Sequence, residues 1–125
     1  MYILVLESST TSAKAMLYNA ADDTYEIETK AYPLYFNNTT LHDAESVFFE
    51  TAALGKTLCS GKKIDAVALG ATWHNVMLCD TDFHPQTPVY LWANTEAAEI
   101  CKNLRDDDVY TRNHYQRTGC MVNAV

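Results

Sequence analysis

The sequence is short of basic residues, since 9 lysines and arginines stand against 16 aspartates and glutamates, a formal net charge of −7 at pH 7. A surface that binds nucleic acid or an anionic membrane needs a basic face, so both kinds of partner are excluded. No apolar run reaches transmembrane length, and the apolar start is too short for a secretory signal. Repeats, linkers and low-complexity tracts are also absent. We therefore expect 125 residues that form one cytoplasmic domain or part of one.

Closely spaced cysteine pairs are also missing. The four cysteines are about twenty residues apart, with no Cys-x-x-Cys pair. A zinc knuckle and a redox dithiol both need such a pair, so neither is indicated. We expect four buried thiols in a reducing compartment, at Cys59, Cys79, Cys101 and Cys120.

The first fifteen residues carry the clearest chemical signal. An apolar run ends at Glu7, a hydroxyl run includes Thr10, Thr11 and Ser12, and Lys14 precedes a second apolar run. This pattern predicts a β-hairpin with a polar turn. Hydroxyls and turn N–H groups can surround phosphate oxygens, an acid at a strand end can hold hydrated Mg²⁺, and a lysine adds positive charge. An ordinary polar turn is the alternative, because Ser and Thr are common turn formers.

The next segments complete an antiparallel meander and begin a helix. Residues 24–30 alternate between polar and apolar types and predict a third strand, and residues 34–41 predict a loop. Asp43 is a plausible N-cap for a helix with apolar residues at three- and four-residue spacings. We expect Phe48 and Phe49 of this helix to lie in the core.

The remaining chain predicts further strands and helices. Residues 64–70 form a compact apolar run, which predicts a central and mostly buried strand. Residues 76–80 and 88–92 predict two strands joined by a turn that is rich in Asp and Pro. Asn94 can cap a helix that ends at Arg105 and the acidic run 106–108, and a short helix follows. We expect the acidic run to be a solvated loop and cap rather than a metal site.

Trp73 and His74 follow the end of a predicted strand, where ligands gather in α/β folds. A Trp ring supplies an apolar wall for carbon-bound hydrogens, and a His ring hydrogen-bonds to hydroxyl or carboxylate. The alternative is a Trp that covers the core beside a His satisfied by the backbone.

Four segments together resemble the carbohydrate kinases of the glycerol kinase, xylulokinase and gluconokinase (FGGY) family. Residues 7–15 resemble its phosphate loop, Asp-x-Gly-Thr-Thr-Ser-x-Lys/Arg-Ala. Residues 71–75 resemble the Thr-x-Trp-His-Ser form of gluconokinase-like members. Residues 76–92 match its apolar strand, Asp, turn and Pro-x-x-x-Trp in order and spacing, and residues 117–120 its Arg-Thr-Gly-Cys. The match at 76–92 is the most specific.

The resemblance implies an α/β fold of the ribonuclease H-like, actin-like ATPase type. A three-stranded antiparallel meander should be followed by helix, strand, hairpin and helix. Residues 1–125 would be the N-terminal part of the first actin-like domain, incomplete, with the second domain absent from this chain. The family's general-base Asp would lie beyond Val125, so the resemblance implies no catalytic residue here and no activity of the chain alone.

The resemblance also implies ATP and Mg as cofactors and a small-molecule sugar or sugar acid as substrate. Glu7 would hold Mg through water. The residues implied to bind phosphate are Thr10, Thr11, Ser12 and Lys14. Those implied to contact the substrate are Trp73, His74, Trp92, Asn94 and Glu96.

The sequence departs from the family pattern at Glu7 for Asp, Ser9 for Gly and Glu96 for Arg. Glu7 adds a methylene, and Ser9 carries a Cβ where glycine permits close approach and positive φ. Glu96 favours a neutral ketose or polyol such as xylulose, whereas the Trp73-His74 motif favours gluconate. The three departures leave a second hypothesis, in which the domain is a catalytically inactive sugar-binding or assembly unit. Under either hypothesis, we expect homodimerisation through the surface that would meet the second domain.

Overall fold

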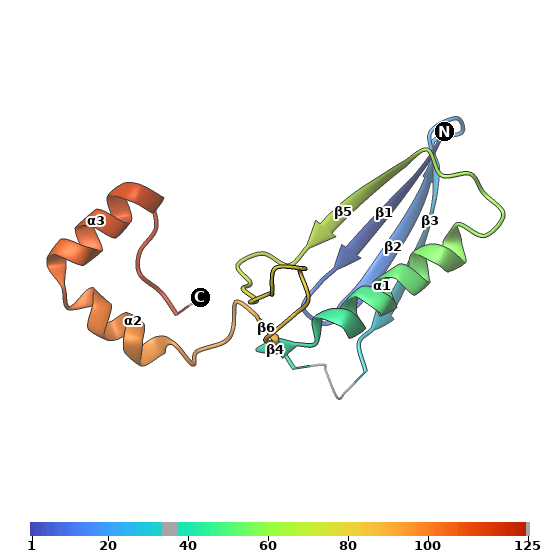
Figure 1. Cartoon of the computed structure of the whole chain (residues 1–125). Coiled ribbons are helices and arrows are strands. Elements are labelled where there is room, and N and C mark those ends of the chain that lie inside the picture. The colour runs from blue at the N-terminus through green and yellow to red at the C-terminus, as the bar shows by residue number, and fades with distance from the viewer. Residues whose placement is uncertain (34–37, 125) are drawn as a thin grey trace.

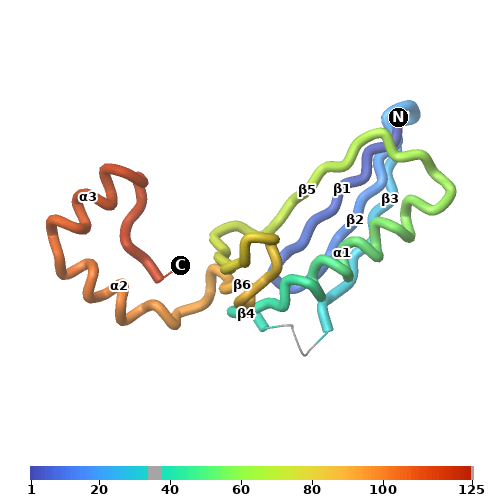
Figure 2. Tube along the Cα trace, viewed as in Figure 1, coloured from blue at the N-terminus to red at the C-terminus, as the bar shows by residue number. Residues whose placement is uncertain are grey.

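The computed structural model describes residues 1–33 and 38–124. Its main sheet has the order β3-β2-β1-β5 (Figures 1 and 2). The first three strands pair antiparallel, whereas β5 runs parallel to β1. The predicted meander and the placing of residues 64–70 in the main sheet are therefore confirmed. The strands are β1 (Tyr2–Ser8), β2 (Ser12–Asn19), β3 (Thr24–Ala31) and β5 (Ala66–Ala71).

Helix α1 (Ala44–Leu58) lies across one face of this sheet and packs against β2, β1 and β3 (Figure 1). Asp43 is its N-cap as predicted, since its side chain accepts a hydrogen bond from the N–H of Ser46 at 2.9 Å. A Cβ added at Gly55 would lie 2.8 Å from Cδ2 of Leu6, so the glycine allows close approach of helix and strand. The buried core between them includes Ala15, Leu17 and Leu58.

The aromatic pair of α1 does not lie in the core, so that prediction is wrong. Phe48 is 65% exposed and Phe49 is 64% exposed. The helix instead turns Thr51, Gly55 and Leu58 toward the sheet. These positions also follow the three- and four-residue spacing, and the close approach at Gly55 favours this face.

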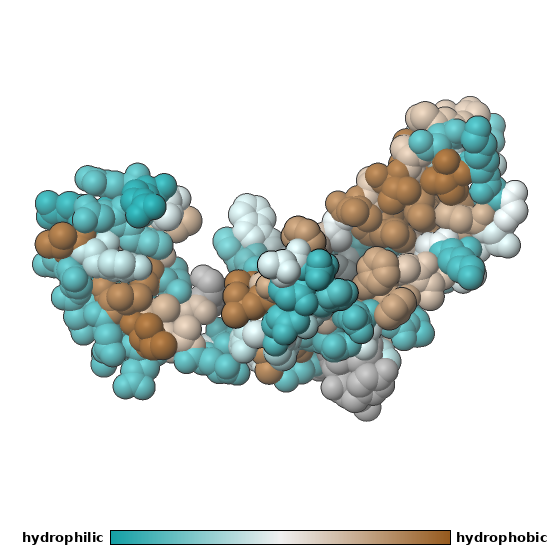
Figure 3. Space-filling view, viewed as in Figure 1, coloured by the Kyte–Doolittle hydropathy of each residue, from teal (hydrophilic) through white to brown (hydrophobic). Residues whose placement is uncertain are grey.

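Strand β5 is neither central nor buried, which also corrects the prediction. All six of its residues are exposed, and Leu69 is 81% and Val67 56% exposed. Among the described strands it forms one edge of the sheet. An apolar run identifies a strand suited to burial, but the elements that would cover it are not encoded in the run itself. Figure 3 shows the resulting apolar side chains gathered over β5 and α1.

A second, small sheet pairs β4 (Leu41–His42) with β6 (Val89–Tyr90). The strands predicted at 76–80 and 88–92 are thus reduced to β6 and two isolated bridges, and between them Asp80 accepts from the N–H groups of Asp82 and His84 in a tight turn. The predicted loop at 34–41 falls partly outside the described residues, at 34–37. The bridges join Val76 with Tyr90 and Cys79 with Pro85.

Helices α2 (Ala98–Arg105) and α3 (Asp108–Thr118) pack on each other, away from the main sheet (Figure 1). Both predicted helices are confirmed, but the cap of α2 is Ala97 rather than Asn94. The acidic run is a cap as expected, since Asp107 accepts from two backbone N–H groups of α3. Within the described ranges, no helix is long and apolar enough to cross a membrane.

The cysteines are all free, but they are not all buried. Cys101 is buried and Cys59 partly buried, whereas Cys79 and Cys120 are exposed. The expectation of four buried thiols is therefore wrong for two of them, which lie in a surface turn and after the last helix, where no element covers them.

Candidate functional site

The hydroxyl-rich segment is the turn between β1 and β2, as predicted. Its closure depends on two serines: the N–H of Ser9 donates to the carbonyl of Ser12 at 2.9 Å, and the Ser9 hydroxyl donates to the same carbonyl at 2.8 Å. Ser9 has no positive φ. The serine that stands where the family has glycine is therefore unstrained, and its hydroxyl stabilises the turn.

Glu7 and Lys14 face each other across the β1–β2 pair at the base of this turn. Lys14 Nζ donates to Glu7 Oε1 at 3.1 Å, and both side chains are a little more than two-fifths exposed, 42% and 43%. The residues predicted for phosphate and for Mg²⁺ thus neutralise each other. A half-exposed pair of this kind is weak enough to be exchanged for a ligand.

Thr10 lies at the tip of the turn and contacts two distant segments. Its carbonyl accepts a hydrogen bond from Nε2 of His42 at 2.9 Å, and its hydroxyl accepts one from Nε1 of Trp92 at 3.3 Å. The second contact joins the predicted phosphate turn directly to one of the residues predicted for the substrate. Thr11 is exposed beside it, and its carbonyl accepts from the N–H of Tyr32 at 3.0 Å.

Sequence reasoning missed two residues that build this arrangement, His42 and Asn75. Asn75 donates to the carbonyl of Thr72 at 2.9 Å and accepts from the N–H of Trp92 at 3.2 Å. It therefore ties the segment after β5 to the segment after β6. Its signal in the sequence was a lone amide next to a strand end, beside the more conspicuous Trp73.

Trp73 and His74 lie at the surface rather than over the core. Trp73 is 76% exposed, and its ring centroid lies 4.8 Å from that of His74. His74 has φ of 60° and no side-chain hydrogen bond within the described part of the chain. The alternative of a core Trp beside a backbone-satisfied His is therefore wrong, and both rings face solvent.

A cavity of about 510 Å³ brings together three of the five predicted substrate residues, His74, Asn94 and Glu96. Asn94 is buried, and its side-chain oxygen accepts from the N–H of Glu96 at 3.0 Å while its amide donates to Oε1 of Glu96 at 3.3 Å. Asn94 thus shapes the turn that presents Glu96. Trp73 and Trp92 are not among the residues that line the cavity.

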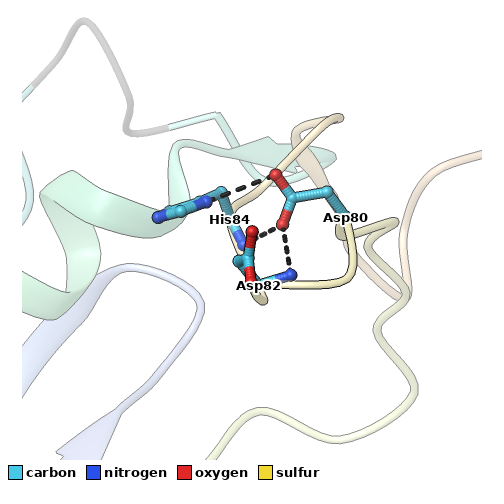
Figure 4. A group of neighbouring side chains, drawn as sticks. All are labelled: Asp80, Asp82 and His84. Carbon is cyan, nitrogen blue, oxygen red and sulfur yellow. Dashed lines mark hydrogen bonds and ion pairs between the residues drawn. The ribbon is translucent and has the colours of Figure 1, made fainter.

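Asp80, Asp82 and His84 form a separate exposed cluster, with ligand atoms within 4.8 Å of one another (Figure 4). Oδ1 of Asp80 accepts from the N–H groups of Asp82 and His84 at 2.9 and 2.8 Å. These backbone donors, that of His84 foremost, lower the pKa of Asp80 below its ordinary value. The hydrogen bonds show how Asp80 forms the predicted turn between residues 81 and 87.

Comparisons with known proteins identify the family of the chain and its fold. The family model described as "FGGY family of carbohydrate kinases, N-terminal domain" matches residues 2–125. The chain is 28% identical over 129 residues to a glycerol kinase of Bacillus licheniformis, covering 97% of this chain and 26% of that protein. It is 29% identical over 129 residues to a gluconokinase of Bacillus subtilis, covering 99% of this chain and 25% of that protein.

Solved structures show the same fold. A gluconate kinase from Lactobacillus acidophilus superposes with a TM-score of 0.78 at 21% identity, over 92% of this chain and 24% of that one. The sheet, its helix and their order are thus those of the ribonuclease H-like, actin-like fold expected from the sequence. The chain spans about a quarter of the length of the curated relatives it matches. It belongs to the FGGY family of carbohydrate kinases, in the part that forms the family's N-terminal domain.

Proposed function

We propose that this chain is the N-terminal part of an ATP-dependent carbohydrate kinase. The reaction is transfer of the γ-phosphoryl group of ATP to a hydroxyl of a sugar or sugar acid in the gluconate or xylulose class. The observation that supports the proposal is the hydrogen bond from Trp92 to the hydroxyl of Thr10, because it joins a residue proposed for the substrate to the turn proposed for phosphate. Phosphoryl transfer depends on holding these two ligands side by side.

The residues of the turn fit a nucleotide with its magnesium ion. Mg²⁺ prefers carboxylate oxygen and water as ligands, which Glu7 supplies at a strand end. Hydroxyls of Thr10, Thr11 and Ser12 donate to phosphate oxygens, and Lys14 adds a positive charge. The magnesium ion would neutralise charge on the phosphates, while these side chains bind and orient them.

The substrate part of the proposal uses the rings and the cavity together. Trp73 and Trp92 would cover the apolar face of an open-chain sugar, while His74 and Asn94 hydrogen-bond with its hydroxyls. Glu96 adds negative charge at the rim of the cavity, where it is exposed. We favour gluconate over xylulose because an exposed carboxylate at this position is screened by solvent.

Catalysis by the complete kinase requires parts that lie outside these residues. We propose that residues 1–125 are the first part of the first of two actin-like domains, and that the general base comes from the remainder of the kinase. Half of a cleft binds ligands weakly and does not place the attacking hydroxyl against the phosphate. We therefore expect no sugar-dependent turnover by this chain alone.

A catalytically inactive sugar-binding or assembly unit is the second candidate. It is favoured by the Glu7–Lys14 ion pair, which occupies both of the charged groups that the nucleotide needs. The two candidates differ in whether the pair opens for a ligand. NMR spectra recorded with magnesium triphosphate test this. If the side-chain resonances of Glu7 and Lys14 shift, the result supports the kinase. If they stay unchanged, it supports the inactive unit.

The sugar site is tested by tryptophan fluorescence, since the chain has only two tryptophans, Trp73 and Trp92. We expect gluconate to change the emission saturably, with the change lost in Trp92→Phe. Coupled ATPase assays with gluconate, xylulose and glycerol should stay at background.

Two outcomes would contradict the proposal. The first is that none of the three sugars changes the emission of the folded chain. The second is turnover by this chain that Thr11→Ala abolishes, because the chemistry would then lie within these residues. If gluconate binds to the Glu96→Arg variant but not to wild type, the proposed substrate becomes a neutral ketose or polyol.

A further inference from the structure

His42 is a buried polar residue to which the proposed phosphate and sugar contacts assign no role. It is 5% exposed and lies in β4, where it pairs with Val89 of β6. Its ring packs edge-on against that of Tyr32, with the centroids 5.4 Å apart. The next residue, Asp43, caps α1, so the backbone on both sides of His42 is held by secondary structure.

The orientation of the ring determines the hydrogen bond that it makes. Nε2 of His42 lies 2.9 Å from the carbonyl oxygen of Thr10. A carbonyl only accepts, so Nε2 carries the proton and donates. His42 thus reaches 32 residues back along the chain to the tip of the β1–β2 turn.

This hydrogen bond also sets the direction of the following N–H group. A trans peptide is planar and holds its C=O and N–H on opposite sides, and none of the described peptide bonds is cis. With the Thr10 carbonyl turned toward buried His42, the N–H of Thr11 is turned away from it. Thr11 is exposed, and its N–H donates no hydrogen bond within the described part of the chain.

We propose that His42 is a positioning residue, which holds the Thr10–Thr11 peptide so that the N–H of Thr11 is presented to a phosphate oxygen. The proposal rests on the phosphate-binding role of the turn. A preoriented N–H group binds an anion without the entropy cost of ordering a flexible loop. Without His42, the hydrogen bond from Nε1 of half-exposed Trp92 to the Thr10 hydroxyl would be the remaining side-chain hydrogen bond to Thr10 within the described residues.

The test uses three substitutions in the 125-residue chain that differ in reach and in hydrogen bonding. His42→Phe keeps a ring against Tyr32 but has no donor. His42→Gln places an amide N–H₂ near the position of Nε2, and His42→Asn has the same amide on a shorter side chain. We expect the Thr11 amide to be ordered in wild type and His42→Gln, and mobile in His42→Phe and His42→Asn, by ¹⁵N relaxation.

Sodium tripolyphosphate with Mg²⁺ is the ligand probe. We expect it to shift the Thr11 amide resonance in wild type and His42→Gln, with at least tenfold weaker affinity in the other two variants. Equal order and equal affinity in all four proteins would overturn the positioning role. Strand resonances of β1 and β2 identify any variant that fails to fold, and the comparison of Gln with Asn then decides.

The two proposals fail in different ways. If tripolyphosphate shifts no turn resonance even in wild type, the phosphate-binding role of the turn is wrong. The relaxation data still decide whether His42 orders the Thr10–Thr11 peptide. If His42 only filled space, Gln and Asn would have similar effects on the Thr11 amide. Rescue of its order by Gln but not by Asn therefore supports the positioning role.

Discussion

At the scale of single residues, His42 is buried, and among the described residues its ring donates one hydrogen bond, from Nε2 to the carbonyl of Thr10. Burial lowers the pKa of His42 below its ordinary value of 6.5, and the hydrogen bond to Thr10 only partly opposes this. The ring is therefore neutral in the folded protein at pH 7. Tyr32, which faces it, adds no charge at this pH.

This lowered pKa predicts that stability depends on pH. Below pH 6.5 the unfolded chain takes up the proton more readily than the folded protein, so the contribution of His42 is present above pH 6.5 and lost as the pH falls. We expect the free energy of unfolding to fall by up to about 1.4 kcal/mol per pH unit in this range. Urea unfolding followed by circular dichroism measures it. His42→Gln should show a smaller slope, and an equal slope would contradict the assignment.

At the scale of elements, α1 begins beside the residue that contacts the turn between β1 and β2. Its N-cap, Asp43, directly follows His42, and its buried face reaches β1 through Gly55. Hydrogen bonds from the side chain of Ser46 and then from its backbone N–H lower the pKa of Asp43, so the side chain is ionised and binds the helix N-terminus at neutral pH.

Loss of this cap has a predictable cost. We expect Asp43→Ala to lower the free energy of unfolding by about 1 kcal/mol, because an N–H of the first turn loses its partner. Asp43→Asn keeps an acceptor and should stay close to wild type. Asp106→Ala is the matched control, because it removes an exposed acid at the C-terminal end of α2. We expect it to change the free energy of unfolding by no more than about 0.5 kcal/mol. Urea titrations of all four proteins test this, and equal costs for the two alanines would exclude a capping effect.

At the scale of the whole molecule, the sheet has an uncovered apolar side. Leu69 of β5 and Phe48 of α1 face a cavity of about 520 Å³ that is lined largely by apolar residues. We call Leu69, Phe48 and the other large apolar residues around this cavity the β5–α1 surface. These others are Leu6, Val47, Val76, Met77, Val89 and Leu91. A surface of this kind favours association with another protein chain.

We therefore propose that the 125-residue chain self-associates through the β5–α1 surface. Replacing Leu69 by Lys should weaken the dimer about tenfold or more, since burial of a leucine side chain contributes about 1.5–3 kcal/mol. Sedimentation velocity over a range of concentrations measures the change. Ile27→Lys places the same charge at an exposed apolar site on β3 and should leave association unchanged. Wild type that is monomeric at high concentration would contradict the proposal.

The sequence by itself determined the local features of this protein. The alternation of residues 24–30, the serines and threonines between two apolar runs, and Asp43 before a periodic segment each specify structure through neighbours a few residues away. Hairpin, third strand and capped helix were predicted for that reason and are present. The residues proposed for phosphate were chosen in the same way, because turn, acid and lysine lie within eight positions of one another, and their role stays a prediction.

Only the tertiary structure decided how these local units meet. Thr10 contacts His42 and Trp92 from 32 and 82 residues away, and no spacing in the sequence encodes either contact. Leu69 is of a residue type that usually lies in the core, yet it is exposed because no described element packs over β5. Burial and long-range hydrogen bonds depend on which faces come together in three dimensions, whereas caps, turns and periodicity depend on the adjacent chain.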